Sequence, residues 1–166
     1  MEAWSEIKGF ESYEMSSFGN VKNGRGKILK PSANATGYLQ AALFWNGKRK
    51  TLCVHKLVAE AFIENELELE HVDHIDGDKL NNNVSNLRYC TLSQNQGNRR
   101  KQTKPTTSQY KGVSWNIGAN KWLAQLQVKP VRKHLGLFDS EEDAAKAYDV
   151  AATEFWKDFK HLNFEA

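Results

Sequence analysis

Residues 71–95 contain the side chains of this chain that are best suited to chemistry. The stretch is crowded with carboxylates, imidazoles and amides and is short of aliphatic residues, unlike a segment that builds a core. Asp73 and His74 are adjacent in it. Neighbouring side chains of an extended segment point to opposite faces, so one of the two can face a metal ion while the other faces a water molecule or a bond to be cleaved. By itself such a pair is more often structural or solvated, and a polar surface loop is the alternative interpretation of this stretch.

Turn and helix signals around this pair predict how it is positioned. The Asp-Gly-Asp at 76–78 and the Asn run at 81–83 favour an irregular loop, since Gly and Asn tolerate positive φ. Residues 87–90 have the character of a short strand, and Thr91 with Gln94 forms a capping-box pattern that starts a helix at Thr91. The stretch thus predicts a strand, a loop, a strand and a helix, whose polar groups are able to converge.

The spaced set of Asp-His, Asp-Gly-Asp, Asn-Asn, Asn-Leu and a helical Asn resembles the HNH nuclease motif of phage-borne homing endonucleases. The resemblance implies a ββα-metal module over residues 66–98. It also implies a role for each matching residue: Asp73 and Asn95 as metal ligands, His74 as the general base, and Asn86 as the amide that braces the loop.

Phosphodiester hydrolysis explains why such residue types are needed. A hard divalent cation takes oxygen ligands, and Mg²⁺ typically uses a few protein oxygens together with waters and phosphate. The cation, Mg²⁺ or Mn²⁺, stabilises charge on the phosphate and on the leaving oxygen. A neutral imidazole deprotonates water well, because its ordinary pKa of about 6.5 lies near working pH. His71 has two readings that stay open: it lines the site, or it lies at the surface.

The overall composition limits the classes of protein that fit. The chain has 166 residues and a formal charge of +3, from 23 basic and 20 acidic residues, which permits a nucleic-acid partner. Acidic residues gather at 64–78, and basic residues at 99–104 and 121–133, as cation capture and phosphate contact would need. With two cysteines and no C-x-x-C pair, a zinc knuckle or a disulfide framework is not expected. No apolar stretch is long enough to cross a membrane, so the expected place is the cytoplasm, that of a bacterial host if a phage encodes the chain.

Residues 1–65 predict a small β-sheet followed by a helix. Residues 37–45 are strongly β-prone, Asn46-Gly47 is a hairpin signal, and His55 opens a helix that ends near Asn65. His55 is interpreted as a helix-start residue whose side chain packs against neighbours or forms a hydrogen bond with the backbone. The segment resembles the modular motif that commonly precedes HNH nucleases, which implies help in DNA binding; the resemblance rests on Trp4, Ile7, Tyr13, Ser16, Gly19, Val21, Gly37, Tyr38 and residues 55–58.

Residues 99–109 have the composition of a basic linker. They are polar, include Pro105 and lack apolar periodicity. Arg99, Arg100 and Lys101 are candidates for contact with the DNA backbone, and a plain solubilising linker is the alternative.

Residues 110–166 predict three antiparallel strands over one helix. The expected strands are 110–115, 121–128 and 133–138, and the helix is 139–156, capped by Ser140. This segment resembles the DNA-binding domain of the plant APETALA and ethylene-response factors; the match is carried by Tyr110, Gly112-Val113, Lys121-Trp122, Leu135-Gly136, Ala144-Ala145, Tyr148-Asp149 and residues 162–164.

That resemblance implies that the sheet enters the major groove of double-stranded DNA, where base edges carry a distinct code. The positions that match base- and phosphate-contacting residues of the family are Lys111, Ser114, Asn116, Gln125, Gln127, Arg132 and His134. Several of these positions are normally Arg or Trp, so the plant factors' target does not carry over. Glutamine pairs well with adenine edges, which favours a different target.

Together these features predict an α+β chain of modules: a small N-terminal β-sheet plus helix, a central ββα-metal HNH module, and a C-terminal three-stranded sheet on one helix. The predicted function is a metal-dependent HNH DNA endonuclease, a site-specific nickase or homing-type nuclease. No protein partner is expected, and the chain is compatible with a monomer. The modular organisation also predicts that removing residues 105–166 weakens site selection more than metal-dependent chemistry.

The alternative from another class is a sequence-specific DNA-binding regulator without catalysis. The intact set of Asp73, His74, Asn86 and Asn95 argues against it, because a scaffold does not need that set. An RNA-binding protein is not favoured, since the sequence has no RNP-like aromatic signature.

Overall fold

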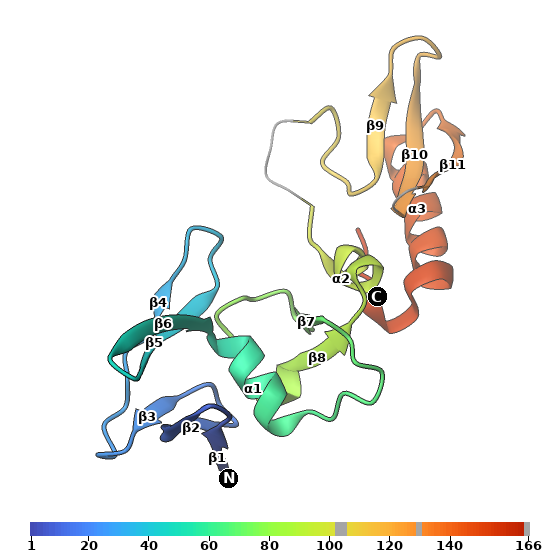
Figure 1. The fold of residues 1–166 in the computed structure, drawn as a ribbon. Helices are drawn as coiled ribbons and strands as arrows, with labels where there is room; N and C mark the ends of the chain where they lie inside the picture. The colour runs from blue at the N-terminus through green and yellow to red at the C-terminus, as the bar shows by residue number, and fades with distance from the viewer. Residues whose placement is uncertain (102–105, 129–130, 165–166) are drawn as a thin grey trace. The chain divides into compact units, whose positions relative to one another are not determined.

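The computed structural model describes residues 1–101, 106–128 and 131–164. By its contacts the chain divides into two compact units, Met1–Thr91 and Leu92–Ala166. Both units mix helices with small antiparallel sheets (Figure 1), so the predicted α+β class is confirmed. Within the described ranges, no helix combines the length and the apolarity needed to cross a lipid bilayer.

The N-terminal unit begins with two three-stranded sheets and a helix. The first sheet has the order β1-β2-β3 and the second has the order β4-β5-β6. Their bounds, with those of the helix that follows, are β1 Trp4–Ile7, β2 Phe10–Ser16, β3 Val21–Asn23, β4 Ser32–Ala33, β5 Leu39–Trp45, β6 Lys48–Cys53 and α1 Val54–Phe62.

The predicted hairpin and helix of this segment are both present. Asn46 and Gly47 join β5 to β6 with φ values of 48° and 72°, as a two-residue hairpin turn requires. Helix α1 ends at Phe62, earlier than the predicted Asn65, because Ile63 already has extended backbone angles.

A two-stranded sheet completes the N-terminal unit. Strand β7, His71–His74, pairs antiparallel with β8, Leu87–Cys90, and a short 3₁₀ helix, Val84–Asn86, precedes β8. Val72 and Leu87 of these strands share one hydrophobic core with Val54 and Val58 of α1 and with buried residues of β1, β2, β3 and β5. The segments on the two sides of the predicted boundary at 65/66 therefore fold around common apolar contacts.

The C-terminal unit is a three-stranded sheet of order β11-β10-β9 packed on a helix. Its elements are α2 Leu92–Asn98, β9 Val113–Asn116, β10 Lys121–Val128, β11 Val131–Phe138, α3 Glu141–Trp156 and a 3₁₀ helix Lys157–Phe159. The Ser140 hydroxyl accepts a hydrogen bond from the Asp143 backbone and so caps α3 as the sequence predicts.

Small side chains let α3 lie close to the sheet. Ala144, Ala145 and Ala152 of α3 and Ala124 of β10 are fully buried. Gly112 has a φ of +76°, and a Cβ there would overlap the ring of Tyr148. These small residues therefore allow α3 to pack close to the sheet.

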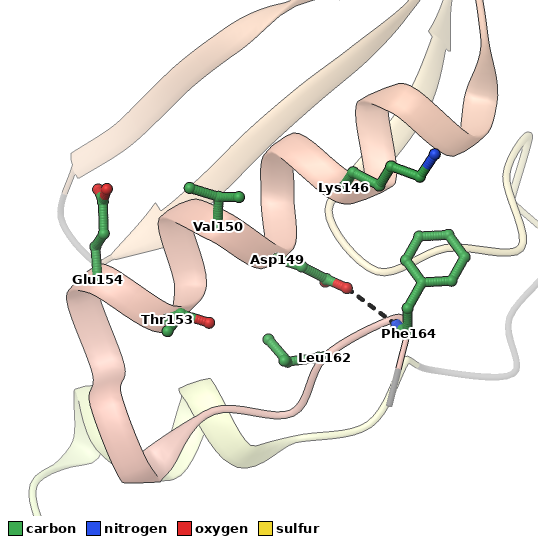
Figure 2. A pocket seen from close by; sticks show the side chains of 7 residues that line it. All are labelled: Lys146, Asp149, Val150, Thr153, Glu154, Leu162 and Phe164. Atoms are coloured by element: carbon green, nitrogen blue, oxygen red, sulfur yellow. Dashed lines mark hydrogen bonds between the residues drawn. The ribbon is translucent and has the colours of Figure 1, made fainter. Parts of the chain in front are cut away.

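The chain end folds back along α3. The Asp149 carboxylate accepts hydrogen bonds from the backbone N–H group of Asn163 at 2.9 Å and from that of Phe164 at 3.0 Å. Figure 2 shows the bond to Phe164. The Asn163 side chain in turn accepts from the Lys111 backbone N–H at 2.6 Å. Phe164, Leu162 and Val150 line a hollow of about 440 Å³, together with the polar side chains of Lys146, Asp149, Thr153 and Glu154.

Part of the predicted linker is structured. Residues 102–105 lie outside the described residues, and α2 ends at Asn98, just before the predicted start at 99. Thr107 accepts a hydrogen bond from the Trp115 backbone at 2.9 Å, and the Gln109 backbone donates to Glu141 at 3.1 Å. The last linker residues thus belong to the C-terminal unit.

Candidate active site

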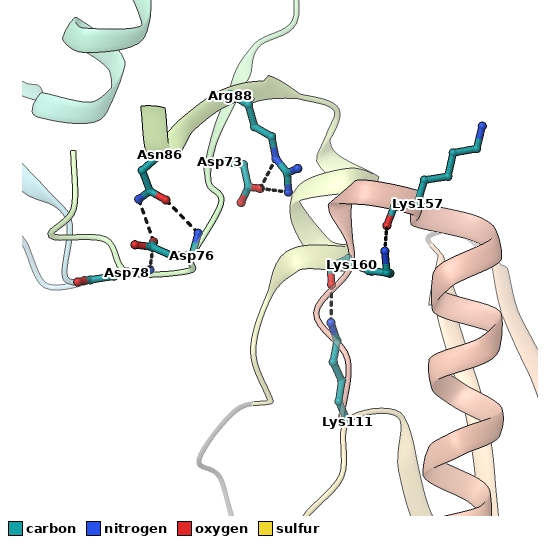
Figure 3. A network of polar contacts seen from close by, with 9 residues as sticks. Asp73, Asp76, Asp78, Asn86, Arg88, Lys111, Lys157 and Lys160 are labelled. Carbon is teal, nitrogen blue, oxygen red and sulfur yellow. Dashed lines mark hydrogen bonds and ion pairs between the residues drawn. The ribbon is translucent and has the colours of Figure 1, made fainter. Parts of the chain in front are cut away.

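The first chemical group of the site is the carboxylate of Asp73 in β7. Its side chain is 6% exposed, and the strand register places Arg88 of β8 directly opposite it. Arg88 donates to the Asp73 Oδ2 atom from Nε at 3.1 Å and from Nη2 at 3.0 Å (Figure 3). The ion pair compensates the burial of the carboxylate. The sequence analysis missed Arg88, although a basic residue in the returning strand is a visible signal.

The second group is the imidazole of His74, which is 4% exposed. Its Nε2 atom lies 3.2 Å from Oδ1 of Asn82, while the Asn82 amide nitrogen donates to the Leu80 carbonyl at 3.0 Å. Because that second bond fixes the amide orientation, Oδ1 of Asn82 is the acceptor and His74 donates from Nε2. The Nδ1 atom of neutral His74 therefore carries the lone pair that can take a proton.

Asn82 itself is held by the N-terminal segment. A Cβ on Gly19 would lie 2.9 Å from the Asn82 Cβ, and Gly19 has a φ of +89°. The Ser17 carbonyl also accepts from the Val84 backbone at 2.8 Å. The turn after β2 thus supports the loop that orients His74. Sequence reasoning treated Asn82 only as a turn former.

His55 of α1 lies beside His74 with a ring-centroid distance of 5.1 Å, and Tyr38 lies 4.9 Å from His55. The His55 side chain is buried, and its Nδ1 atom has no hydrogen-bond partner among the residues that the structure describes. Burial, with the nearby His74 and Lys56, lowers the pKa of His55 to about 4. His55 is therefore neutral near pH 7. His55 is more than a residue near the start of α1, because its ring packs beside the ring of His74.

The loop between β7 and β8 is tied by the side chain of Asn86. The Asn86 amide donates to Asp76 at 2.9 Å and to the Asn81 carbonyl at 2.8 Å, and its oxygen accepts from the Asp76 backbone at 3.1 Å (Figure 3). Burial alone would raise the pKa of Asp76, but hydrogen bonds from Asn86, Asn81 and the Asp78 backbone hold it below its ordinary value. The loop is thereby fixed around an ionised carboxylate.

The donor set is suited to a hard cation. Among the described residues no group of three or more His, Cys, Asp or Glu side chains could hold a metal ion. A metal held by one carboxylate and one amide oxygen needs waters or phosphate as further ligands, which is how Mg²⁺ is commonly bound. Asp73 belongs to the N-terminal unit, and Asn95 lies on α2 in the C-terminal unit. Asn86 and His74 also belong to the N-terminal unit.

The C-terminal sheet gathers six of its seven predicted DNA-contacting residues on one face. Ala124 and Leu126 of β10 pack toward α3, so the alternate residues of this strand face away from the helix. The register pairs Gln125 with His134 and Gln127 with Arg132. Paired residues share a face, and the same argument adds two residues of β9 to it. The face therefore consists of Ser114, Asn116, Gln125, Gln127, Arg132 and His134.

Lys111 differs from the other predicted DNA contacts. Its amine donates to the Gly97 carbonyl at 2.6 Å and lies over the rings of Tyr148 and Trp156 (Figure 3). Burial lowers the pKa of Lys111 to about 8, with Asp149 opposing and Arg99 assisting the shift. The head group is thus engaged inside the unit.

The basic residues after α2 lie at the surface or near it. Arg99 and Arg100 are exposed, and Lys101 is half-buried. Arg99 lines a hollow of about 320 Å³ together with Lys111, Gln125 and Gln127. A basic residue of the predicted linker is thereby placed next to residues of the sheet.

Two family models match segments of the chain. Residues 53–96 match the family model described as HNH endonuclease, and residues 2–44 match the model of the NUMOD4 motif. A relative from Bacillus phage SP01, the DNA endonuclease I-HmuI, is 46% identical over 90 residues, which cover 53% of this chain and 52% of that protein.

A solved structure and a plant protein extend these matches. The structure concerns DNA binding and cleavage by the HNH homing endonuclease I-HmuI; it is 44% identical with a TM-score of 0.50, over 54% of this chain and 52% of the other. The AP2-like ethylene-responsive transcription factor ANT of Arabidopsis thaliana is 37% identical over 70 residues, 36% of this chain and 13% of the plant protein. This chain spans about half or less of the length of each of these relatives.

The lowered pKa of His55 predicts a pH-dependent stability. Between about pH 6.5, the ordinary pKa of histidine, and about pH 4, the pKa of His55 in the folded protein, the unfolded chain binds more protons than the folded chain does. Stability is therefore fully present above pH 6.5 and is lost as the pH falls through that window. Relative to His55→Gln, the wild type should lose roughly 2 kcal/mol of unfolding free energy, measured by urea denaturation at several pH values. His134→Gln, at an exposed position, is the control; equal pH dependence in wild type and His55→Gln would contradict the assignment.

The Arg88–Asp73 pair predicts that the stability of the folded protein depends on metal binding. Arg88→Met leaves the buried Asp73 carboxylate without this counter-charge and should cost about 3 kcal/mol in metal-free buffer. A divalent cation at Asp73 would replace part of the lost charge, so Mn²⁺ should raise the melting temperature of Arg88→Met more than that of the wild type. Lys22→Met is the matched control, because its ion pair with Glu14 is far more exposed. Equal Mn²⁺ shifts in wild type and Arg88→Met would argue against metal at Asp73.

Proposed function

Because the chain carries a NUMOD4 motif and an HNH endonuclease module, we propose that it is a divalent-metal-dependent DNA endonuclease that hydrolyses phosphodiester bonds. The observation that carries the proposal is the buried Asp73–His74 pair of β7, whose two side chains have different partners. A scaffold would have no need to bury an acid and a base side by side. One HNH module per chain supports one strand cut per chain, as in a site-specific nickase or a homing-type nuclease.

The roles follow from the geometry of the chain's own groups. His74 takes a proton from water at Nδ1, because Asn82 accepts from its Nε2. Asn86 holds the loop between the two strands. Asp73 and Asn95 would hold Mg²⁺ or Mn²⁺, which supplies charge stabilisation at the phosphate and the leaving oxygen. Arg88 would keep the Asp73 carboxylate in place for that purpose.

We further propose that double-stranded DNA is held by both units. In the N-terminal unit the β5–β6 hairpin carries exposed Lys48, Arg49 and Lys50 next to exposed Phe44 and Trp45, a combination suited to phosphates and bases. In the C-terminal unit the open sheet face presents amide, imidazole and guanidinium groups of the kinds that read base edges in the major groove. The AP2-like relative supports this use of the sheet.

The nuclease proposal is tested by nicking of supercoiled DNA that contains the flanking sequence of the gene. The wild type should nick with Mg²⁺ or Mn²⁺ and should not nick with a chelator. His74→Ala should lower the nicking rate by about 100-fold or more, and Asn82→Ala by a smaller factor, because one removes the base and the other its orientation. Gel shifts on the same DNA should change little for either variant. Clear binding without any wild-type nicking would favour the binding-only regulator; equal loss of binding and cutting in His74→Ala would refute its role as base.

The sheet-face proposal is tested by specificity. The double variant Gln125→Ala, His134→Ala should lower the ratio of specific to non-specific DNA affinity by about 10- to 100-fold at fixed salt, since it removes base-reading groups. The salt dependence should stay nearly the same, because the lysine and arginine side chains that neutralise phosphate are unchanged. Thr153→Ala, exposed on α3, is the control. An unchanged specificity ratio would exclude this face as the reader, and tighter binding to RNA than to DNA in competition would exclude DNA as the preferred partner.

A further inference from the structure

Helix α2 has little intrinsic tendency to form. It contains seven residues, Leu-Ser-Gln-Asn-Gln-Gly-Asn, of which Ser, Asn and Gly are weak helix formers. Helices much shorter than about 12 residues are marginal in water by themselves. Its shape therefore depends on neighbours that bind it.

Those neighbours include the end of α3 and the chain that follows it, within the same unit. The Trp156 indole donates from Nε1 to the Ser93 hydroxyl at 3.3 Å. The Gly97 carbonyl accepts from the Lys111 amine at 2.6 Å and from the His161 backbone at 3.1 Å. Three donors from residues 111–161 of the C-terminal unit thus converge on one side of α2, which belongs to the same unit.

The packing at Gly97 leaves no room for a side chain. A Cβ at this position would lie 2.6 Å from two atoms of the Trp156 ring and closer still to the Phe159 carbonyl oxygen. Trp156 is 5% exposed, and Gly97 is buried. Glycine is thus required here for close approach, and its weak helix propensity is offset by the contact that it permits.

The docked face determines which way Asn95 points. Ser93 and Gly97 are four residues apart and lie on one face of α2, against Trp156. Asn95 is two residues from each, which is a rotation of about 200° around the helix axis. Its side chain is therefore on the face turned away from Trp156.

We propose that the C-terminal unit orients Asn95: Trp156, Lys111 and the segment after α3 hold α2 by Ser93 and Gly97 and so fix the direction in which the Asn95 side chain points. This inference rests on the proposed role of Asn95 as a metal ligand. Gly97 and Ser93 are then positioning residues. Removing residues 105–166 takes away these contacts and should therefore weaken metal binding by Asn95 as well as site selection, which reverses the expectation drawn from the modular organisation alone.

Two substitutions in α2 test the docking in the full chain. Gly97→Ala places a methyl group against Trp156, and Ser93→Ala removes the acceptor of the indole N–H. Both changes raise the intrinsic helix propensity of α2, so any loosening must come from lost docking. Val113→Ala is the matched control, because it weakens the core of the C-terminal domain at a cluster that does not include α2. Asn95→Ala removes the proposed ligand directly.

Two measurements besides nicking separate the possibilities. Hydrogen exchange of the α2 amides, in metal-free protein, reports docking; we expect it to be about tenfold faster in Gly97→Ala, less so in Ser93→Ala, and unchanged in Val113→Ala. The dissociation constant for Mn²⁺, by electron paramagnetic resonance, reports the ligand. It should rise about tenfold in Gly97→Ala and in Asn95→Ala, and stay at the wild-type value in Val113→Ala.

Each outcome has a definite meaning. Unchanged α2 exchange in both Gly97→Ala and Ser93→Ala would overturn the docking. Faster exchange with wild-type Mn²⁺ binding and nicking, while Asn95→Ala impairs both, would overturn the positioning role alone. Wild-type Mn²⁺ binding and nicking in Asn95→Ala would overturn the ligand assignment on which the inference rests. If no protein nicks DNA, the wild type included, although the wild type binds Mn²⁺, the result would count against the proposed function. The docking of α2 would then be judged by hydrogen exchange alone.

Discussion

The antiparallel pairing of β7 with β8 is the constraint on which the candidate active site depends. It sets Asp73 across from Arg88, so that a buried carboxylate has its counter-charge in the neighbouring strand. Because successive residues of a strand alternate in direction, the next residue, His74, turns to a different set of partners. The carboxylate and the imidazole thereby have different partners at adjacent positions of one strand.

The N-terminal motif contributes structure to the candidate site. Gly19 and Ser17 support the loop that carries Asn82, and Asn82 fixes which nitrogen of His74 holds the proton. Helix α1 supplies His55, a neutral imidazole packed against His74. The shared hydrophobic core explains why the two segments behave as one unit, even though each matches a family model of its own.

The sheet of the C-terminal unit has two faces of different composition. One face presents polar side chains outward, and the other packs small residues against α3. The end of α3 and the following chain bind α2 through Trp156 and the Gly97 carbonyl. A weak seven-residue helix becomes an ordered element by this contact.

The sequence by itself determined the local elements and the identity of the chemical groups. Turn residues, alternation and capping patterns predicted β7, β8, the start of α2 and all three strands of the C-terminal sheet, because these signals act over a few neighbouring residues. The motif spacing singled out Asp73, His74, Asn86 and Asn95 as candidates. Only the tertiary structure decided which partners these groups have. Arg88, Asn82 and His55 reach the site through strand pairing, loop closure and helix packing, and Gly97 is required by a ring from a distant helix; such contacts join residues far apart in the chain and leave no periodic trace in it.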